Sequence, residues 1–237
     1  MSQDPESDHF LKIYRTQAAA YHHMIAAEDV DGNLLPALQT AVSLGGKRVL
    51  DLGSGTGRIP ILLDGIAGQV IGLDLQLAML AESRHLRDSK RRHWELVCAN
   101  MPNLPFARAA FEVAVSGWAI GHTCSWSPQD WPARVDGILA EMSRVTSPGG
   151  ALIVIETLGT GVDYPHAPTQ ALSRYYQQLE TRWGFQRQVV QTDYQFDSPA
   201  TAAASTAFFF GPALGKKIRA NSWARVPEWT GVWHRQV

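Results

Sequence analysis

Three glycines at alternate positions and two aspartates carry the clearest chemical meaning in this sequence. Gly53, Gly55 and Gly57 follow an apolar run that contains Asp51, and Asp74 closes the next apolar run along the chain. Glycine tolerates positive φ and leaves no Cβ between the backbone and a ligand. A glycine-rich turn after one strand and an acid at the end of the next are typical of a nucleoside-cofactor site on a parallel sheet.

The spacing of these glycines narrows the choice of cofactor. A dinucleotide fingerprint would place its third glycine at position 58, where this chain has Arg58. A nucleotide phosphate loop would continue with Gly-Lys-Ser/Thr, which is absent. The spacing therefore disfavours both, and leaves open another nucleoside cofactor or a tight turn without a ligand.

Apolar patterning predicts the elements that position these residues. The predicted strands are 48–52, 70–73, 94–98, 111–116, 151–155, 185–194 and 229–235. The predicted helices are 8–27, 34–42, 58–63, 76–90, 134–145, 170–183 and 202–220. Strands within 48–156 are continuous apolar runs that alternate with helices, which favours a parallel sheet covered on both faces. After 157, the order strand, long connection, strand allows an antiparallel hairpin at the sheet edge.

Five motifs in this order resemble the class I S-adenosylmethionine-dependent methyltransferases, especially the small-molecule, type 11-like group. They are 49–57, 70–74, 100–106, 111–117 and the helix that ends at Pro148-Gly149-Gly150. The resemblance covers roughly residues 45–156 well and the rest in outline.

The resemblance implies a fold as well as a cofactor. The implied fold is a Rossmann-like α/β three-layer sandwich with a seven-stranded, mostly parallel sheet, an antiparallel last strand and a helical N-terminal cap. We expect one methyltransferase domain over 1–237, with the cap in 1–44, the cofactor core in 45–156 and substrate-side helices and edge strands in 157–237.

The resemblance also assigns cofactor contacts residue by residue. The implied contacts with S-adenosylmethionine are Tyr21, Asp51, Gly53, Ser54, Gly55, Gly57, Asp74, Leu75, Met79, Asn100, Met101, Gly117 and Trp118. Asp51 would face the ammonium group, and Asp74 would accept hydrogen bonds from both ribose hydroxyls, each worth roughly 1.5–3 kcal/mol. Asn100 stands where relatives usually carry Asp, but its amide oxygen can still accept from the adenine amino group.

A candidate catalytic residue follows the fourth predicted strand. A bound sulfonium is already an activated methyl donor, so the protein has to hold a nucleophile in line at about 3–3.5 Å and exclude water. A general base is needed only where the acceptor must lose a proton early. His122 lies at the carboxyl edge of the sheet, and the ordinary pKa of histidine suits proton transfer near neutrality. We expect His122 to act as a base or substrate anchor, with packing or helix capping as the alternative.

Other residues are candidates for the acceptor side. Weaker candidates for proton transfer are His22, His23, Glu156, Tyr164 and His166. Two interpretations are open for the aromatic residues Trp118, Trp126 and Trp131: they line an apolar or aromatic acceptor pocket, to which Phe208-Phe209-Phe210 add a wall or lid, or they are ordinary core residues.

Composition argues against other classes of protein. A net charge of −1 and a pI of about 6.7 give no electrostatic case for a nucleic-acid or membrane partner. Cys98 and Cys124 are too few for a disulfide scaffold or a cysteine metal site, and fit a cytoplasmic setting. The polar first six residues and the absence of a long apolar run predict neither a signal peptide nor a membrane span.

The expected function is methyl transfer from S-adenosylmethionine to an O, N or C atom of a small molecule, without a metal ion. One alternative is an S-adenosylmethionine-binding protein without methyl transfer, and another is an NAD(P)-dependent oxidoreductase, which Arg58 disfavours. The sequence does not reveal the acceptor, the methylated atom or the oligomeric state.

Overall fold

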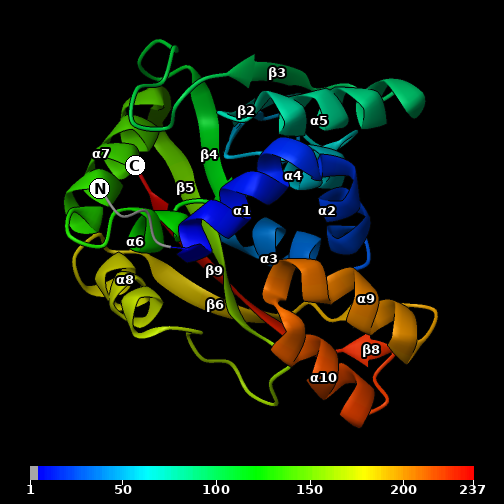
Figure 1. The fold of residues 1–237 in the computed structure, drawn as a ribbon. Helices are drawn as coiled ribbons and strands as arrows, with labels where there is room; N and C mark the ends of the chain where they lie inside the picture. The colour runs from blue at the N-terminus through cyan, green and yellow to red at the C-terminus, as the bar shows by residue number, and fades with distance from the viewer. Residues whose placement is uncertain (1–4) are drawn as a thin grey trace.

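One mixed sheet with helices on both faces forms the body of the molecule (Figure 1). The computed structural model describes residues 5–237. The first six residues, for which we expect no signal peptide, therefore lie partly outside the described residues. The seven strands lie in the order β3-β2-β1-β4-β5-β9-β6. They are β1 Arg48–Leu52, β2 Gln69–Asp74, β3 Glu95–Cys98, β4 Phe111–Gly117, β5 Thr146–Thr160, β6 Gln186–Gln191 and β9 Glu228–Gln236, while β7 Tyr194–Gln195 pairs separately with β8 Arg225–Val226. The expected Rossmann-like sandwich is confirmed.

The helices follow the predicted pattern with two interruptions. They are α1 Pro5–Thr16, α2 Ala18–Ile25, α3 Leu34–Ala41, α4 Arg58–Leu63, α5 Leu77–Ser89, α6 His122–Trp126, α7 Trp131–Val145, α8 Gln170–Thr181, α9 Pro199–Phe210 and α10 Pro212–Ala220. The single helix predicted at 8–27 is wrong, because the chain leaves helical geometry at Gln17 (φ −134°). The single helix predicted at 202–220 is also wrong, because Gly211 has φ 86°. Among the described helices none has the length and apolar character needed to cross a membrane.

The strands nearest the glycine turn are buried on both faces. Val49, Leu50 and Leu52 of β1 have no exposed surface. β1 pairs in parallel with β2 on one side and β4 on the other, and β4 pairs in parallel with β5. A parallel sheet covered by helices requires such continuous apolar strands, and it brings their carboxyl ends to one edge.

The last strand brings a distant part of the chain to that same edge. β9 lies antiparallel between β5 and β6, which confirms the antiparallel last strand. Since β9 runs in the opposite direction, its first residue, Glu228, pairs with Thr160 at the end of β5. The strand predicted at 151–155 is present but extends further, because pairing with β4 already begins at Thr146 and pairing with β9 continues to Thr160.

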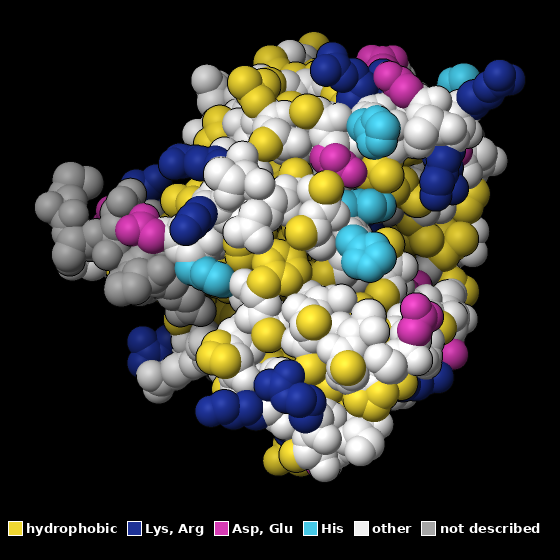
Figure 2. All heavy atoms as spheres, turned by 45° about the vertical axis from the view of Figure 1, so that its right-hand side comes forward, with side chains coloured by type: hydrophobic (Ala, Val, Ile, Leu, Met, Phe, Trp, Pro, Cys, Tyr) yellow, Lys and Arg dark blue, Asp and Glu magenta, His cyan; other side chains and the backbone are white. Residues whose placement is uncertain are grey.

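A helical cap covers this edge of the sheet. Ile13, Tyr14 and Ala18 of the N-terminal helices pack against Met79 of α5. α2 also packs against α9, which lies beside it in Figure 1. On the face shown in Figure 2, hydrophobic, histidine and charged side chains are interspersed, and Lys and Arg form separate small groups. The expected N-terminal cap is confirmed, and it encloses the space above the strand ends.

Candidate functional site

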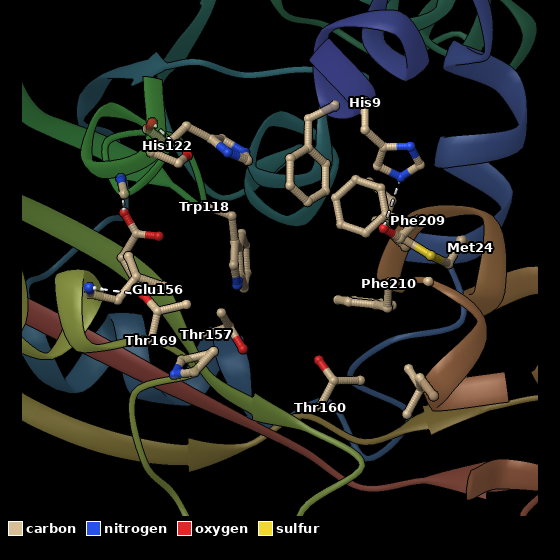
Figure 3. Close-up of a pocket in the computed structure, with 18 of the residues that line it drawn as sticks. His9, Met24, Trp118, His122, Glu156, Thr157, Thr160, Thr169, Phe209 and Phe210 are labelled. Atoms are coloured by element: carbon tan, nitrogen blue, oxygen red, sulfur yellow. Dashed lines mark hydrogen bonds between the residues drawn. The ribbon is translucent and has the colours of Figure 1, made fainter. Parts of the chain in front are cut away.

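A cavity of about 990 Å³ lies under the cap at the carboxyl edge of the sheet. Its walls come from α1, α2, α6, the ends of β4 and β5, the start of β9 and the end of α9. Figure 3 shows Trp118 and Glu156 on one side, Phe209 and Phe210 on the other, and Thr160 at the base. The two phenylalanine rings thus lie across the cavity from Glu156 and Trp118.

The glycine turn lies at the end of β1. Gly53, Gly55 and Gly57 have φ of 70°, 54° and 95°, values that are strained for other residues. A Cβ at position 53 would lie 2.4 Å from Ala119 Cβ, and one at position 57 would lie 2.7 Å from Ser83 Oγ. At Gly55 the nearest atom is a flexible methionine methyl group at 3.3 Å. Packing therefore requires two of the glycines, and Gly55 is the one that leaves room for a ligand.

Two aspartates lie beside the turn. Asp51 is 1% exposed, and its Oδ1 has no hydrogen-bond partner among the described residues. Burial, with a smaller contribution from the charge of Asp74, raises the pKa of Asp51 well above its ordinary value. Asp74 Oδ2 accepts from the N–H of Gly55 and Oδ1 from the N–H of Gln76, both at 2.8 Å. Asp51 therefore lacks the cation or donor that a buried carboxylate requires.

Apolar and amide side chains lie beyond Asp74. Leu75 is 56% exposed, whereas Met79 is buried under the cap. Asn100 and Met101 follow β3, the first exposed and the second half-buried. Cys98 Sγ donates to the carbonyl of Leu75 at 3.8 Å. This end of the site is open to solvent, while the end under α1 is covered.

Trp118 connects the turn region with the cavity. Trp118 follows Gly117 at the end of β4 and has a φ of 51°. Its backbone N–H donates to the carbonyl of Ile155 at 2.6 Å. The guanidinium carbon of Arg58 lies 3.8 Å from the centroid of its indole ring. Arg58 Nη1 in turn donates to Glu28 Oε2 at 2.7 Å. Arg58, which argued against a dinucleotide, therefore holds the indole ring in the cavity wall.

His122 begins α6 and lines the cavity. Its Nε2 is hydrogen bonded to the Tyr14 hydroxyl at 2.8 Å, and its ring stacks on Trp126 with centroids 4.8 Å apart. Burial lowers the pKa of His122 to about 4. The expectation of an ordinary histidine pKa near neutrality is therefore wrong: the ring is neutral at pH 7 and is a weaker base than expected.

Two buried glutamates line the cavity on the sheet side. Glu156 is 4% exposed and its Oε1 accepts from the N–H of Gly121 at 2.7 Å. Glu228 is 2% exposed and its Oε1 accepts from the Thr157 hydroxyl at 2.8 Å, whereas its Oε2 has no partner in the part of the chain that the structure describes. Burial raises the pKa of each carboxyl group to about 8, with the charge of Glu28 contributing at Glu228. Both carboxyl groups are therefore largely protonated at pH 7.

α2 joins the cap to both parts of the site. Tyr21 lines the cavity, with its ring centroid 5.5 Å from that of Tyr14 and 5.3 Å from that of Phe209. His22 Nδ1 lies 3.0 Å from Thr56 Oγ1 in the glycine turn, a hydrogen-bond distance. A movement of α2 would therefore change the turn and the cavity together.

The three tryptophans do not cluster in the structure. Trp118 lines the cavity, but Trp126 lies against His122 and is 37% exposed. Trp131 is buried in the core, with its ring centroid 6.2 Å from that of Tyr175. Of the three tryptophans, Trp118 thus lines the cavity and Trp131 follows the alternative of core packing. The expected phenylalanine wall is present in part, because Phe209 and Phe210 line the cavity.

The weaker candidates for proton transfer are dispersed. Glu156 lines the cavity, and His22 contacts the glycine turn instead. Tyr164 and His166 are exposed and lie against each other, with ring centroids 5.5 Å apart. His23 is exposed on α2.

The cavity also contains side chains that no sequence motif indicated. They are Phe10, Tyr14, Glu28, Tyr194 and Glu228. They come from segments that are far apart in the chain and meet only when the cap folds over the sheet and β9 inserts beside β5. In the sequence, the one indication of such a residue was an acid, Glu228, directly before the last predicted strand.

Comparisons with known proteins place this geometry in context. Residues 50–154 match a family model described as a methyltransferase domain. The chain is 28% identical over 152 residues to malonyl-[acyl-carrier protein] O-methyltransferase of Legionella pneumophila, across 62% of this chain and 49% of that protein. It is 29% identical over 187 residues to demethylmenaquinone methyltransferase of Thermobifida fusca, across 76% of this chain and 70% of that protein.

A solved structure shares the fold across nearly the whole chain. It is a SAM-dependent methyltransferase from Aquifex aeolicus, with a TM-score of 0.55 at 16% identity, across 99% of this chain and 95% of that one. The chain spans only about half the length of the Legionella relative, 49%.

Proposed function

We propose that this chain, which belongs to the class I S-adenosylmethionine-dependent methyltransferases, transfers the methyl group of S-adenosylmethionine to an O, N or C atom of a small molecule. The observation that carries this proposal is the cavity of about 990 Å³ beside the glycine turn, with Arg58 and Trp118 in the wall between them. Adjacent sites for a nucleoside cofactor and a second small molecule are what direct transfer requires.

The residues around the turn fit S-adenosylmethionine, the cofactor of this family. Its ammonium group would supply the partner that the buried Asp51 Oδ1 lacks, and its carboxylate would lie near the turn at 53–57. Each oxygen of Asp74 accepts one backbone N–H and has a further lone pair for a ribose hydroxyl. The Ser54 hydroxyl, which is buried and has no partner, is a further contact on this side.

The remaining cofactor contacts follow from the same placement. Adenine would pack between Leu75 and Met79, and would cover the exposed leucine side chain. The adenine edge would face Asn100 and Met101, which follow β3. Tyr21 would close over the methionine end from the cap.

The chain has to position the acceptor and keep water out. Bound here, S-adenosylmethionine would supply an activated methyl group for transfer to the acceptor atom; sulfur would keep the electron pair of the broken methyl–sulfur bond, and the acceptor would lose a proton. Gly117 and Trp118 would lie beside the sulfonium. The cap and α9 enclose the space in which the acceptor atom approaches in line, at about 3–3.5 Å.

His122 is proposed to contact the acceptor as an anchor or base. Its neutral imidazole, held by Tyr14, offers a hydrogen bond to the acceptor group. Where the acceptor must lose a proton early, ionised Glu156 is the stronger base, because burial raises its pKa to about 8 whereas that of His122 is lowered to about 4.

Other features support a small-molecule acceptor without a nucleic-acid or membrane partner. Basic side chains form no continuous patch on the face shown in Figure 2.

Within residues 5–237, no group of three or more His, Cys, Asp or Glu side chains is arranged to hold a metal ion. Cys98 and Cys124 are free, which accords with the proposed cytoplasmic setting. We infer that cap, core and C-terminal elements act as one domain.

Turnover with a mixture of metabolites tests the proposal. The protein is incubated with S-adenosylmethionine in the presence and absence of the mixture, and S-adenosylhomocysteine is measured by mass spectrometry. Release that depends on the mixture is expected. Tight binding of S-adenosylmethionine without such release would instead identify a binding protein that lacks methyl transfer.

A further inference from the structure

Carboxyl groups outnumber cationic groups in the cavity. Glu28, Glu156 and Glu228 line it, and among the described residues Arg58 is the one arginine or lysine that does so. Arg58 pairs with Glu28 at 2.7 Å, and the two side chains are 16% and 3% exposed. Because this ion pair is balanced, the other two carboxyl groups face the cavity without a cationic partner among residues 5–237.

Glu228 shows most directly that a partner is missing. Its Oε1 accepts from Thr157, but its Oε2 is buried and accepts from no group in the described chain. The side chain begins β9 and lines the cavity. A buried carboxyl oxygen without a donor costs free energy, which a ligand that donates to it would recover.

Glu156 presents a second carboxyl group to the same space. One of its oxygens accepts from Gly121, and the other points toward the space beside Trp118 (Figure 3). The close approach requires a glycine at 121, because a Cβ there would lie 2.8 Å from Glu156 Oε2. The carboxyl group is therefore fixed by packing and is not a mobile surface group.

The opposite wall of the cavity is apolar. Phe209, Phe210 and Leu214 line it, together with Met24 and Ile25 of α2. A wall of this kind binds the hydrocarbon or aromatic part of a ligand. The ligand that matches both walls has an apolar body and a group that donates several hydrogen bonds.

We propose that the acceptor is an amphipathic amine, whose protonated amino group is held by Glu156 and Glu228 while its apolar body lies against Phe209 and Phe210. This inference rests on the proposed methyl transfer and names its substrate class. For methylation at nitrogen, the bound ammonium group first gives a proton to ionised Glu156, and the nitrogen lone pair freed in this way attacks the methyl group. A carboxylate or phosphate would find no unpaired cation in the cavity. Arg58 keeps one buried N–H group, Nη2, without a partner. That group offers a hydrogen bond to a hydroxyl or carbonyl oxygen of the same ligand.

Binding of an ammonium group would change the protonation of both glutamates. Burial raises the pKa of Glu156 and Glu228 to about 8, and a neighbouring cation favours the ionised form. At pH 7, binding of the ammonium group therefore releases protons from the two carboxyl groups. The affinity for the amine rises from pH 6 to pH 8, and falls only near the pKa of the amine itself, roughly 10. The titratable groups that interact with Glu156 are Tyr14, Cys124, Tyr175 and Tyr176, and His122 lines the same cavity. Those near Glu228 are Glu28, Arg58, Tyr176, Asp193 and Tyr194.

Matched ligands test the proposal on the full chain saturated with S-adenosylhomocysteine. Phenylethyl, indolylethyl and decyl bodies are each titrated as the primary amine, the alcohol and the carboxylate by calorimetry. In at least one series the amine should bind about tenfold more tightly than the alcohol and carboxylate, the effect of a charge-assisted hydrogen bond. Its heat at pH 7 should depend on the buffer, since protons are released. The proposal would be overturned if no amine binds, or if the alcohol or carboxylate binds as tightly as the amine or more tightly in every series. It would also be overturned if binding of the amine releases no protons.

Two variants and a matched control complete the test. Glu228→Gln and Glu156→Gln should each weaken amine binding about fivefold or more and change alcohol binding less than about twofold. Glu95→Gln, an exposed glutamate on β3, should change neither. S-adenosylmethionine affinity is measured on every protein. If the unsubstituted chain binds the cofactor but shows no preference for the amine, this inference alone is overturned, whereas failure of the unsubstituted chain to bind the cofactor overturns the proposed function. If a variant fails to fold, proton release when the amine binds to the unsubstituted chain still tests the proposal.

Discussion

The cofactor wall of the site and its acceptor wall meet at Trp118 but are built differently. The cofactor wall consists of residues 51–57 and 74–79. The acceptor wall consists of His122, Glu156, Glu228 and the end of α9. In the cofactor wall, backbone groups make the contacts: the N–H groups of Gly53 and Ser54 both donate to the carbonyl of Leu73, at 2.8 and 2.9 Å. In the acceptor wall, side chains from elements far apart in the chain make them. A backbone wall changes only if the fold changes, whereas a side-chain wall can change residue by residue.

The acids of the two walls differ in the same way. Asp74 uses both oxygens to bind backbone N–H groups of its own wall. Glu156 has one such bond and Glu228 has none from the backbone, but one from the Thr157 hydroxyl. The backbone thus fixes the carboxylate of Asp74 in the cofactor wall, whereas the acceptor wall leaves carboxyl oxygens for a ligand. This difference predicts that substitutions separate cofactor affinity from acceptor chemistry.

The largest effect is expected from Gly53→Ala in the cofactor wall. Its Cβ would lie 2.4 Å from Ala119 Cβ at a φ of 70°, so the turn has to move. Strain and overpacking together cost about 2–6 kcal/mol, which should lower S-adenosylmethionine affinity roughly 100-fold and also lower the melting temperature. Gly137→Ala in α7, where nothing lies within 4 Å of the added Cβ, is the control and should preserve both. Equal behaviour of the two variants would contradict a wall fixed by its backbone.

Asp74→Ala should weaken S-adenosylmethionine binding about tenfold or more, because it removes the acceptor for both ribose hydroxyls. Asp88→Ala, at an exposed side chain near the end of α5, is the matched control. Calorimetric titration measures both. Unchanged affinity in Asp74→Ala would remove this residue from the cofactor wall.

His122→Ala should lower turnover about tenfold while cofactor affinity stays the same, since the side chain belongs to the acceptor wall. His85→Ala, at an exposed position on α5, should leave both unchanged. Steady-state kinetics and cofactor titration distinguish the two effects. A loss of cofactor affinity that accounts for the lower turnover would show that the two walls are not separable here.

Tyr14→Phe should lower turnover by a smaller factor, about two- to fivefold. It removes the hydroxyl that lies 2.8 Å from His122 Nε2, a hydrogen bond worth about 0.5–1 kcal/mol, and leaves the ring in place. Combined with His122→Ala, the tyrosine substitution should have no additional effect on turnover. Additive losses in the double variant would contradict action through His122.

The pH dependence of stability should show the smallest difference between the walls. The folded pKa of Glu228 is raised to about 8 from an ordinary 4.5, so its stabilising contribution is complete below pH 4.5 and is lost as pH rises through 8. Glu228→Gln should therefore lose less stability than the unsubstituted chain between pH 5 and pH 8.5, by a few degrees in melting temperature, given about 2–4 °C per kcal/mol. Thermal unfolding monitored by circular dichroism measures this. Parallel curves would show that Glu228 is not protonated in the folded state.

The two walls also differ in how far the sequence predicted them. The turn at 53–57 and Asp74 lie within short contiguous motifs, whose glycine and acid spacing reflects backbone geometry directly. Glu228 enters the site only because β9 inserts antiparallel beside β5, and Tyr14 only because α1 folds over α5. Neither event leaves a local pattern in the sequence.

Burial explains the sequence-based errors at single residues. The position of His122 at the carboxyl edge followed from strand order, but its pKa depends on the aromatic rings that surround it. Trp131 and Trp118 are close in sequence, yet helical geometry turns Trp131 into the core. The pKa of a group and the direction of a side chain require the folded contacts.

Titration of one protein preparation with S-adenosylmethionine and with NADH, by calorimetry, tests the central claim most directly. The glycine turn, Asp51 and Asp74 predict one S-adenosylmethionine bound per chain and no binding of NADH, since Arg58 occupies the position of the third dinucleotide glycine. Binding of NADH, or no binding of S-adenosylmethionine, would contradict the account.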